Sequence, residues 1–481
     1  MTAVVDMSID RALCVDLDGT LLRGNVLHES TFALLRTDPL SVLRIPFWLR
    51  EGRAATKRRI AERVGLDVET LPYEESLLTF LRAERDKGRP IVLVTASDEK
   101  FARQIAAHLG LFDEVIASDG RTNLRSHAKA ERLVERFGED GFDYAGNSRD
   151  DLAVWDKAHT AFVVGREKVA VDYAQRVKAR RFASKRTVSR FRIWTKALRL
   201  HQWLKNALLF VSLVLAGQVA NADAWVSASL GFLAFGLCAS SVYVLNDLLD
   251  LPSDRRHSTK RNRPLAAGLV SVPDALLAGL ACLVAAVSIA LLLPPLFGLV
   301  LATYYLTTLA YSFVLKRKML VDVFTLAGLF TVRVIAGAAA IQVEMSTWLL
   351  AFSMFFFLSL ALVKRFVELA SQPVAENGKV AGRGYMPGDI ETLAQAGLAS
   401  GFASAVVLAL FIDSPAMAKG YNHPELIWLL CPIVLYMVTR IWMLARRDQM
   451  HDDPVVFLMK DWRSLLLTAI GATVLLAAKL A

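Results

Sequence analysis

The stretch "VLNDLLDLPSDRRHSTKRNRP" (residues 244–264) follows a long apolar run and places three acids and an amide beside five cations. Asn246, Asp250 and Asp254 are spaced by four residues, and Asp247 lies three residues before Asp250. On a helix this spacing brings the four side chains to one face. Like charges at such spacing repel one another, and acids close to a membrane are costly. The pattern therefore predicts a magnesium site, because Mg²⁺ takes one or two carboxylates and completes its shell with water and phosphate oxygens.

The cations that follow the acids fit the same interpretation. Lys260, Arg261 and Arg263 suit the remaining charge of a phosphate group. The plainer alternative is a charge-balanced loop end at a membrane interface, although three clustered acids exceed what membrane topology needs. Pro252 lies within the acidic stretch and lacks a backbone donor, so we expect the helix to kink or unwind there. Whether Asp254 ligates the metal directly is left open by the sequence.

Long apolar segments dominate the chain from Trp203 onward. The whole chain has 481 residues, is 54% hydrophobic and carries a formal charge of +10. Segments of about 20 apolar residues are long enough to span a bilayer. We expect about nine spans, near residues 203–220, 224–245, 273–293, 295–315, 321–341, 346–363, 392–412, 425–445 and 464–480. This C-terminal part, residues 200–481, is thus predicted to be an all-α, multi-pass membrane domain.

Positive charge is distributed unevenly between the loops of this domain. The loops after the even-numbered spans contain Arg255, Arg256, Lys260, Arg261, Arg263, Lys316, Arg317, Lys318, Lys364, Arg365, Lys379, Arg383, Arg446, Arg447, Lys460 and Arg463. The other loops contain only Lys419. By the positive-inside rule, the charged loops and the N-terminal part face the cytoplasm. We therefore expect a plasma-membrane protein of the bacterial type with a cytoplasmic N-terminal domain.

A basic segment joins the two parts of the chain. Residues 166–199 are predicted to be a linker, and residues 176–199 contain ten cations and no acid. A solvated linker is one interpretation. Its place just before the first span favours contact with anionic lipid headgroups, where each cation contributes roughly 1 kcal/mol. Sparse aromatic residues argue against nucleic acid as a partner.

The N-terminal part begins with acids at the end of an apolar run. "ALCVDLDGTLL" (residues 12–22) is predicted to be a strand that leads into Asp16 and Asp18. Alternate residues of an extended segment share a face, so these two side chains point together. "PIVLVTAS" (residues 90–97) is predicted to be a second strand that ends in hydroxyls, among them Thr95.

Two further elements complete this part. "AKAERL" offers Lys129, and "DYAGNSRDDLAVW" (residues 143–155) is predicted to be a strand followed by a turn with Asp150 and Asp151. Helical stretches such as 99–109 and 128–137 alternate with the strands. This alternation predicts a parallel, Rossmann-type α/β sheet with its ligand at the carboxyl ends of the strands.

In this order, the four elements resemble those of the haloacid dehalogenase superfamily of phosphohydrolases. The resemblance covers about residues 10–165 and implies that Asp16 accepts the phosphoryl group while Asp18 acts as general acid and base. It further implies that Thr95 and Lys129 bind the phosphoryl group, and that residues 23–88 form a small, mostly helical cap. The implied magnesium ligands are Asp16, Asp18, Asp150 or Asp151, and Asn147, where many members have an acid. A degenerate domain with a regulatory role is the alternative.

The membrane part resembles the UbiA superfamily of intramembrane prenyltransferases. The matching stretches are "NDLLDLPSDR", "TKRNRPLAAG" and "YSFVLKRKMLVD" with "RVIAG". Three further stretches resemble decaprenyl-phosphate phosphoribosyltransferases: "LRLHQWLKN" (198–206), "HSTKRNRPLAAG" (257–268) and "HDDPVVFLMKDWRS" (451–464). That branch transfers phosphoribose from phosphoribosyl pyrophosphate to a polyprenyl phosphate. The resemblance implies that Asp247, Asp250 and Asp254 hold the magnesium pyrophosphate of the donor.

The loop "KRKMLVD" distinguishes between branches of this superfamily. Aromatic prenyltransferases have a second acid-rich motif there, whereas this chain has three cations and the single acid Asp322. Cations suit a lipid phosphate that binds directly. The expected substrate-binding residues are Asn246, Lys205, Lys260, Arg261, Arg263, Lys316, Lys318, Asp322, Arg333 and Lys364.

The expected protein is therefore a bifunctional membrane enzyme with one magnesium site in each domain. Its expected partners are a polyprenyl phosphate, phosphoribosyl pyrophosphate and anionic membrane lipids. The alternatives are an aromatic prenyltransferase, for instance of 4-hydroxybenzoate, and a lipid-binding scaffold without chemistry. The oligomeric state, a homo-oligomer included, is left open by the sequence.

Overall fold

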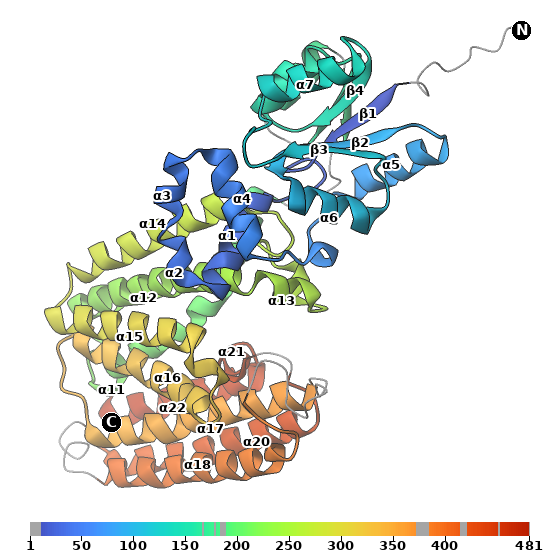
Figure 1. The fold of residues 1–481 in the computed structure, drawn as a ribbon. Helices are drawn as coiled ribbons and strands as arrows, with labels where there is room; N and C mark the ends of the chain where they lie inside the picture. Colours follow the sequence, from blue (N-terminus) through green and yellow to red (C-terminus); the bar gives the residue numbers. More distant parts are fainter. Residues whose placement is uncertain are drawn as a thin grey trace, which may run out of the picture. The chain divides into compact units, whose positions relative to one another are not determined.

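The computed structural model describes residues 11–165, 168–177, 179–182, 189–371, 384–413, 421–450 and 453–480 (Figure 1). Contacts between residues divide the chain into two units. Unit 1 contains Met1–Ala197 and Leu245–Leu276, and unit 2 contains Leu198–Val244 and Leu277–Ala481. Each unit is described separately below.

A six-stranded parallel sheet forms the centre of unit 1. Its strand order is β3-β2-β1-β4-β5-β6, and every neighbouring pair is parallel. The strands are β1 Ala12–Asp16, β2 Ile91–Asp98, β3 Glu114–Ser118, β4 Phe142–Gly146, β5 Thr160–Val164 and β6 Arg180–Phe182. The predicted parallel α/β sheet is confirmed. The strand order reverses at β1, which pairs with both β2 and β4, and ligands of open α/β sheets bind at such a switch point.

The central strand β1 is buried on both faces, which explains its unbroken apolar run. Leu13 and Val15 face a core that includes residues of α5 and α6, whereas Cys14 faces a core that includes residues of α7, α8 and α9. Helices therefore cover both faces of the sheet (Figure 1). Their bounds are α5 Glu75–Asp86, α6 Glu99–Leu109, α7 His127–Phe137, α8 Leu152–Trp155, with the 3₁₀ turn η2 Arg149–Asp151 before it, and α9 Lys168–Arg176.

Four helices between β1 and β2 form the expected helical cap. They are α1 Val26–Thr37, α2 Pro39–Val42, α3 Ile45–Arg50 and α4 Arg53–Arg63, followed by the 3₁₀ turn η1 Val68–Thr70. The cap is shorter than expected at its C-terminal end. α5 lies within the predicted range 23–88, but its Leu77 and Leu81 pack in the same core as Leu13 and Ile91. It is therefore a helix of the sheet layer.

The sheet also extends beyond residue 165, into the stretch expected to be a linker. α9 and β6 lie there, and β6 pairs with β5 in parallel register. Arg180 of β6 is exposed and stacks over the rings of Phe80 and Phe182, so this cation packs against the surface of the sheet domain. α10 Arg190–Ala197 completes the segment, whereas Lys178, Lys185 and Arg186 lie outside the described residues.

The quoted acidic stretch belongs largely to unit 1. The long helix α12 Ala222–Leu249 ends there, followed by α13 Leu251–Arg256 and the 3₁₀ turn η4 Lys260–Asn262. Pro252 lies in the first turn of α13, where its missing donor costs no helical hydrogen bond. Within this unit the Arg255 guanidinium forms two hydrogen bonds with Glu29 of α1, at 2.6 and 3.1 Å.

Helices make up unit 2. After η3 Leu200–Leu208 and α11 Leu209–Leu215 come α12, α14 Val272–Ala290, α15 Pro295–Phe313, η5 Leu315–Arg317, α16 Val321–Ala340, α17 Thr347–Ser371, α18 Asp389–Ile412, η6 Pro424–Leu429, α20 Leu430–Arg446, α21 Pro454–Leu458 and α22 Trp462–Leu480. Among the described residues, eight helices are long and apolar enough to cross a membrane. The chain is thus a multi-pass membrane protein. The first expected span, 203–220, is instead the shorter apolar helix Leu200–Leu215.

Helix α16 is the most buried of these eight candidate spans, and α14 and α22 are the least buried. α14 exposes a row of large apolar side chains, including Leu277, Leu280 and Val284, as a lipid-facing helix does. α16 instead contains small residues that allow close packing. A Cβ atom on Gly337 would lie 2.0 Å from the Leu209 carbonyl oxygen, so α11 crosses α16 backbone to backbone.

Candidate active sites

The carboxyl ends of the central strands bring a buried cluster of polar groups together in unit 1. Asp16 is the last residue of β1, and its Oδ1 accepts a hydrogen bond from Lys129 Nζ at 2.7 Å. The same ammonium donates to the Tyr144 hydroxyl at 2.9 Å and lies 3.5 Å from Asp151 Oδ1. Tyr144 in turn donates to Asp151 at 2.7 Å. One lysine thus neutralises two buried acids and is fixed between them.

Asp18 is held by a different set of donors. Its Oδ1 accepts from the backbone N–H of Val26 at 2.7 Å, where α1 begins, and its Oδ2 accepts from the Ser97 hydroxyl at 2.6 Å. Asp16 and Asp18 both line one cavity, as the spacing predicts. Thr95 is fully buried and its hydroxyl accepts from Ser97 N, so at this strand end Ser97 and not Thr95 lines the cavity.

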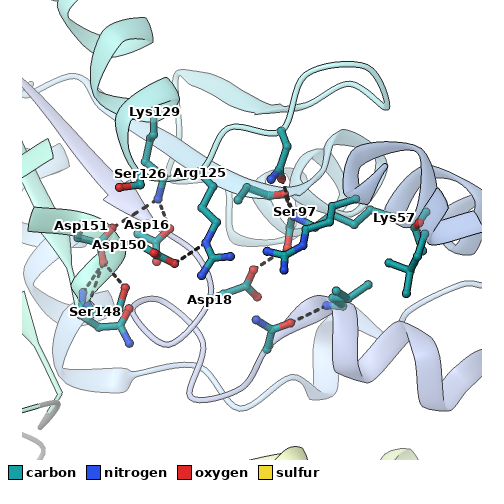
Figure 2. Close-up of a pocket in the computed structure, with 18 residues that line it drawn as sticks. Asp16, Asp18, Lys57, Ser97, Arg125, Ser126, Lys129, Ser148, Asp150 and Asp151 are labelled. Atoms are coloured by element: carbon teal, nitrogen blue, oxygen red, sulfur yellow. Dashed lines mark hydrogen bonds and ion pairs between the residues drawn. The ribbon is translucent and has the colours of Figure 1, made fainter. Parts of the chain in front are cut away.

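The cavity has a volume of about 530 Å³ and mixes acids with cations. Figure 2 shows Lys129, Asp16 and Asp151 at one end and Lys57 of the cap helix α4 at the other, with Asp18 and Arg125 between. The charged lining residues are Asp16, Asp18, Asp150, Asp151, Arg53, Lys57, Arg125 and Lys129. A pocket of this size and charge suits a phosphorylated small molecule or headgroup.

Burial controls the protonation of these acids. It raises the pKa of Asp16 to about 7, although Lys129 acts in the opposite direction. Burial also raises the pKa of Asp18, against the hydrogen bond from Ser97. For Lys129 burial alone would lower the pKa, but Asp16 and Asp151 outweigh it and raise the pKa. The cluster therefore combines a permanent cation with two carboxyls that keep their protons to higher pH than exposed ones.

The oxygens beside Asp16 fit a magnesium ion. Thr20 Oγ1 lies 3.1 Å from both Asp16 Oδ2 and Asn147 Oδ1, yet a hydroxyl has one proton and can donate to only one of them. Asp16 Oδ2 and Asn147 Oδ1 therefore share a single hydroxyl proton, and a cation bound beside them would satisfy both oxygens. Of the two further candidates, Asp151 is buried in the cluster, whereas Asp150 pairs with Arg125 at 2.7 Å. No group of three or more His, Cys, Asp or Glu in the described residues is arranged to hold a metal.

The acidic loop of unit 1 also gathers its carboxylates around one point. Arg263 Nη1 lies 3.2 Å from Asp247 Oδ1 and 2.5 Å from Asp254 Oδ2. Both acids are almost fully buried. They meet despite Pro252, because the backbone bond from Asp254 N to Asp250 O at 2.8 Å keeps the helical turn. A cationic nitrogen thus lies where the two oxygens converge, and a divalent cation held there would have to displace Arg263.

The other expected residues of this loop lie nearby in the chain. Asn246 and Asp247 belong to the last turns of α12, and Asp250 is the N-cap residue of α13. Lys260 and Arg261 lie in η4, where Lys260 is partly buried and Arg261 is exposed. Arg263 is therefore the cation that pairs with Asp247 and Asp254, whereas Lys260 and Arg261 lie about one turn before it in the chain.

A second charged cluster lies in unit 2. Asp453 Oδ2 accepts from Lys205 Nζ at 2.7 Å and from Lys364 Nζ at 2.9 Å. Burial raises the pKa of Asp453, but the two ammonium groups outweigh it and hold the pKa well below its usual range. Lys205 and Asp453 belong to "LRLHQWLKN" and "HDDPVVFLMKDWRS", 248 residues apart in the chain. Two stretches singled out in the sequence therefore meet at one ion cluster.

Two further expected residues are fully enclosed in unit 2. Asp322 is predicted to bind substrate, but its carboxylate has no exposed surface, pairs with Arg365 at 2.6 Å and accepts from Tyr385 at 2.6 Å. The pair is part of the packing of unit 2, and a role of Asp322 in substrate binding stays a prediction. Arg333 donates to Asn206 Oδ1, the Leu329 carbonyl and the Tyr304 hydroxyl.

The loop at η5 differs from these buried positions. Lys318 is exposed and Lys316 is partly buried, so the positive charge of this loop is accessible. Asp322 follows it as a buried residue in the first turn of α16. In the part of the chain that the structure describes, the accessible charge of the loop is therefore cationic.

Comparison with known proteins identifies both parts of the chain. The model of the UbiA prenyltransferase family matches residues 207–462, more than half of the chain. The chain belongs to the UbiA prenyltransferase family. The model of the haloacid dehalogenase-like hydrolases matches residues 13–156, so this UbiA-family protein carries a hydrolase-like domain in front of its membrane domain.

Individual relatives differ in how much of the UbiA-family chain they match. An uncharacterized protein, y4nM, of Sinorhizobium fredii is 41% identical over 96% of this chain and 90% of its own length. A decaprenyl-phosphate phosphoribosyltransferase of Mycolicibacterium smegmatis is 38% identical, over 36% of this chain and 56% of its own length. A solved UbiA homolog of Archaeoglobus fulgidus, bound to GPP and Mg²⁺, is 16% identical over 60% of this chain and 99% of its own, with a TM-score of 0.47.

Several site residues of this UbiA-family protein were not expected from its sequence. Tyr144, Thr20 and Ser97 complete the cluster around Asp16 and Asp18, and Asp453 binds the two lysines of unit 2. A signal existed for Ser97, which ends the same strand as Thr95, and for Asp453, which lies in a quoted stretch. Tyr144 carries no such signal, because a tyrosine within a strand reads as a core residue.

Proposed function

We propose that this protein transfers 5-phosphoribose from phosphoribosyl pyrophosphate to a polyprenyl phosphate, and that its N-terminal domain removes the 5-phosphate of the product. The transferase corresponds to residues 200–481 and the phosphatase to residues 1–165. The observation that carries the first part is the burial of Asp322 in its pair with Arg365. This acid is not accessible for holding a prenyl diphosphate through magnesium, which disfavours the aromatic prenyltransferase.

The charge of unit 2 supports an anionic acceptor. Lys205, Lys364 and Arg333 are buried or partly buried, and Asp453 is the carboxylate that the first two share. The three oxygens that accept hydrogen bonds from Arg333 are all neutral. Cations within a membrane domain are expensive and serve substrates or counter-ions. A polyprenyl phosphate supplies the negative charge that this unit lacks.

In the proposed transfer, the bond between the anomeric carbon and the pyrophosphate oxygen breaks, and its electron pair leaves with the pyrophosphate. An oxygen of the lipid phosphate then bonds to the anomeric carbon. Asp247, Asp250 and Asp254 would hold magnesium, which supplies positive charge against the leaving pyrophosphate. Arg263, displaced from Asp247 and Asp254, is free to donate to phosphate oxygens. The protein contributes position and charge rather than covalent chemistry.

In the proposed hydrolysis, Asp16 attacks the 5-phosphate and the bond between phosphorus and the ribose oxygen breaks. Asp18, whose raised pKa favours a bound proton, donates it to that oxygen. Water then attacks the aspartyl phosphate and gives its proton back to Asp18. Lys129 neutralises the phosphoryl oxygens. Asp16 and Asn147 would hold magnesium at this site, with Asp151 fixing Lys129.

The location of the domains follows from the charge distribution of the loops. The bias of Lys and Arg toward one set of loops favours a bacterial-type plasma membrane and a cytoplasmic N-terminal domain. The basic segment 176–199 would then lie beside anionic headgroups. A phosphatase tethered on that side meets its lipid substrate at an effective concentration of about the millimolar range.

A product assay tests the proposal. Purified full-length protein, magnesium, phosphoribosyl pyrophosphate and a polyprenyl phosphate should give polyprenyl-phosphoryl ribose, identified by mass spectrometry. Asp16→Asn should make the 5-phosphorylated lipid accumulate, and Asp250→Asn should abolish transfer while hydrolysis of a small phosphate ester continues. Prenylation of an aromatic acid from a prenyl diphosphate, without phosphoribosyl transfer, would overturn the proposal.

A further inference from the structure

The phosphatase cavity is larger than the cluster that would hold one phosphoryl group. The cluster of Asp16, Lys129 and Asp151 lies at one end, and the opposite end is lined by the cap (Figure 2). There α4 contributes Arg53 and Lys57 to the lining. These residues are four apart and therefore share a face of the helix. The cavity thus has two cationic ends with Asp18 between them.

The two ends differ in how their cations are compensated. Lys129 is paired with carboxylates, and so is Arg125 in the middle of the cavity. Lys57 Nζ instead donates to the Ala96 carbonyl at 2.5 Å and to Asn123 Oδ1 at 2.9 Å, both of them neutral. Within the described residues, Arg53 forms no hydrogen bond or ion pair. The cap end therefore has two positive charges without a carboxylate partner.

The backbone adds to this positive potential. α4 is an eleven-residue helix that begins at Arg53, its N-cap is Gly52, and no side chain caps its first N–H groups. Uncapped N–H groups and the helix dipole favour an anion at this terminus. The positive potential of the helix start therefore adds to that of Arg53 and Lys57, which line this end of the cavity.

We propose that Arg53 and Lys57, with the N-terminus of α4, bind a second anionic group of the phosphatase substrate, namely the phosphodiester at the anomeric carbon of a 5-phosphoribosyl lipid. This inference rests on the proposed function. The 5-phosphate lies at Asp16 and Lys129, and the ribose spans the middle of the cavity. The phosphodiester then reaches the cap end, from which the lipid chain leaves.

Selectivity follows from this arrangement. A monophosphate such as ribose 5-phosphate satisfies one end and leaves the two cap cations without an anion. A substrate with phosphate groups at both ends of the sugar satisfies both. The domain would thus discriminate its lipid-linked substrate from free pentose phosphates by charge rather than by the lipid chain.

The test compares two soluble substrates on the full-length protein in detergent: ribose 5-phosphate and ribose 1,5-bisphosphate, whose 1-phosphate stands in for the phosphodiester. Release of the 5-phosphate is followed by phosphate assay and by NMR of the remaining sugar. Wild type should prefer the bisphosphate in kcat/KM by roughly tenfold or more, and Arg53→Ala should reduce this preference to less than about threefold, mainly through KM. Arg53→Lys should restore part of it.

Arg59→Ala is the matched control on the same helix. Arg59 pairs with Glu51 and does not line the cavity, so this variant should keep the wild-type preference. Equal kcat/KM for both substrates in wild type, or an undiminished preference in Arg53→Ala, would overturn the inference while leaving phosphatase activity and the proposed function in place. Hydrolysis of neither substrate would overturn both the inference and the phosphatase half of the proposed function.

Discussion

Asp453→Asn tests whether the ion cluster of unit 2 receives the lipid phosphate. Asp453 accepts from Lys205 at 2.7 Å and from Lys364 at 2.9 Å, and an amide of the same shape removes only its charge. The two ammonium groups then face each other without an anion. We expect the variant to be less stable than wild type but to bind polyprenyl phosphate more tightly.

The size of the loss follows from the burial of the two lysines. Breaking a buried pair by removing one partner costs about 3–5 kcal/mol. The Lys205 side chain is 8% exposed, so solvent hardly screens its charge once Asp453 is neutral. The Lys364 side chain is 36% exposed, so solvent partly screens its charge. We therefore expect the lower end of that range, about 3 kcal/mol. Because the folded pKa of Asp453 is depressed, its stabilisation is fully present above its unfolded pKa, and it is lost only as pH falls through the folded value.

Thermal unfolding of the full-length protein in detergent at neutral pH measures both effects. Without ligand, Asp453→Asn should unfold at a lower temperature than wild type. Added polyprenyl phosphate should then raise the Tm of the variant more than that of wild type, because a ligand that binds the folded state stabilises it by about 2.7 kcal/mol at a hundredfold excess over Kd. A neutral polyprenol of the same length should have no such effect.

Asp461→Asn provides the matched control, since Asp461 forms a similar pair with Arg440 at 2.7 Å. It should also lose stability, but polyprenyl phosphate should stabilise it no more than wild type. If the lipid stabilises Asp453→Asn no more than it stabilises wild type, Lys205 and Lys364 do not bind its phosphate and the reasoning fails.

Three further predictions concern other parts of the molecule. At limiting magnesium the phosphatase rate should rise on the acid side with a midpoint near 7, because burial raises the pKa of Asp16 to about 7 and only its carboxylate attacks, and it should fall at higher pH as Asp18 loses the proton that it donates; a rate independent of pH would contradict this. Asn147→Asp should lower the magnesium concentration needed for half-maximal hydrolysis, since it adds a carboxylate beside Asp16, and an unchanged magnesium titration would exclude Asn147 as a ligand. Gly337→Ala should lower the free energy of unfolding by about 1–3 kcal/mol, because its Cβ would lie 2.0 Å from the Leu209 carbonyl oxygen. Gly328→Ala, which meets no atom within 4 Å, is its control, and equal Tm values for the two variants would refute the close crossing.

The sequence was most informative where one strand carries a continuous apolar run. β1 and β2 are buried along most of their length and end in polar residues, so both were predictable. β6 was not, because "RRF" reads as part of a basic linker. Its Arg180 stacks on Phe80 and Phe182, and such a use of a cation depends on residues distant in the chain. Short edge strands therefore need the tertiary structure before they can be identified.

The membrane unit shows a different limit of sequence reasoning. The sequence shows where each charged residue lies along the chain, but it does not show which acids and cations form ion pairs. Asp322 and Arg365 are 43 residues apart and form a closed pair, so neither adds to the charge offered to a ligand.

Once such pairs are set aside, the buried charge that remains in the described residues of unit 2 is positive. Lys205 and Lys364 share a single carboxylate, and the oxygens that accept hydrogen bonds from Arg333 are neutral. Buried charge in a low-dielectric environment is tolerated when a counter-ion neutralises it. A substrate that brings a phosphate into the membrane domain supplies that counter-ion, as a polyprenyl phosphate would. The sign of the uncompensated charge therefore favours an anionic lipid substrate, independently of any likeness in sequence.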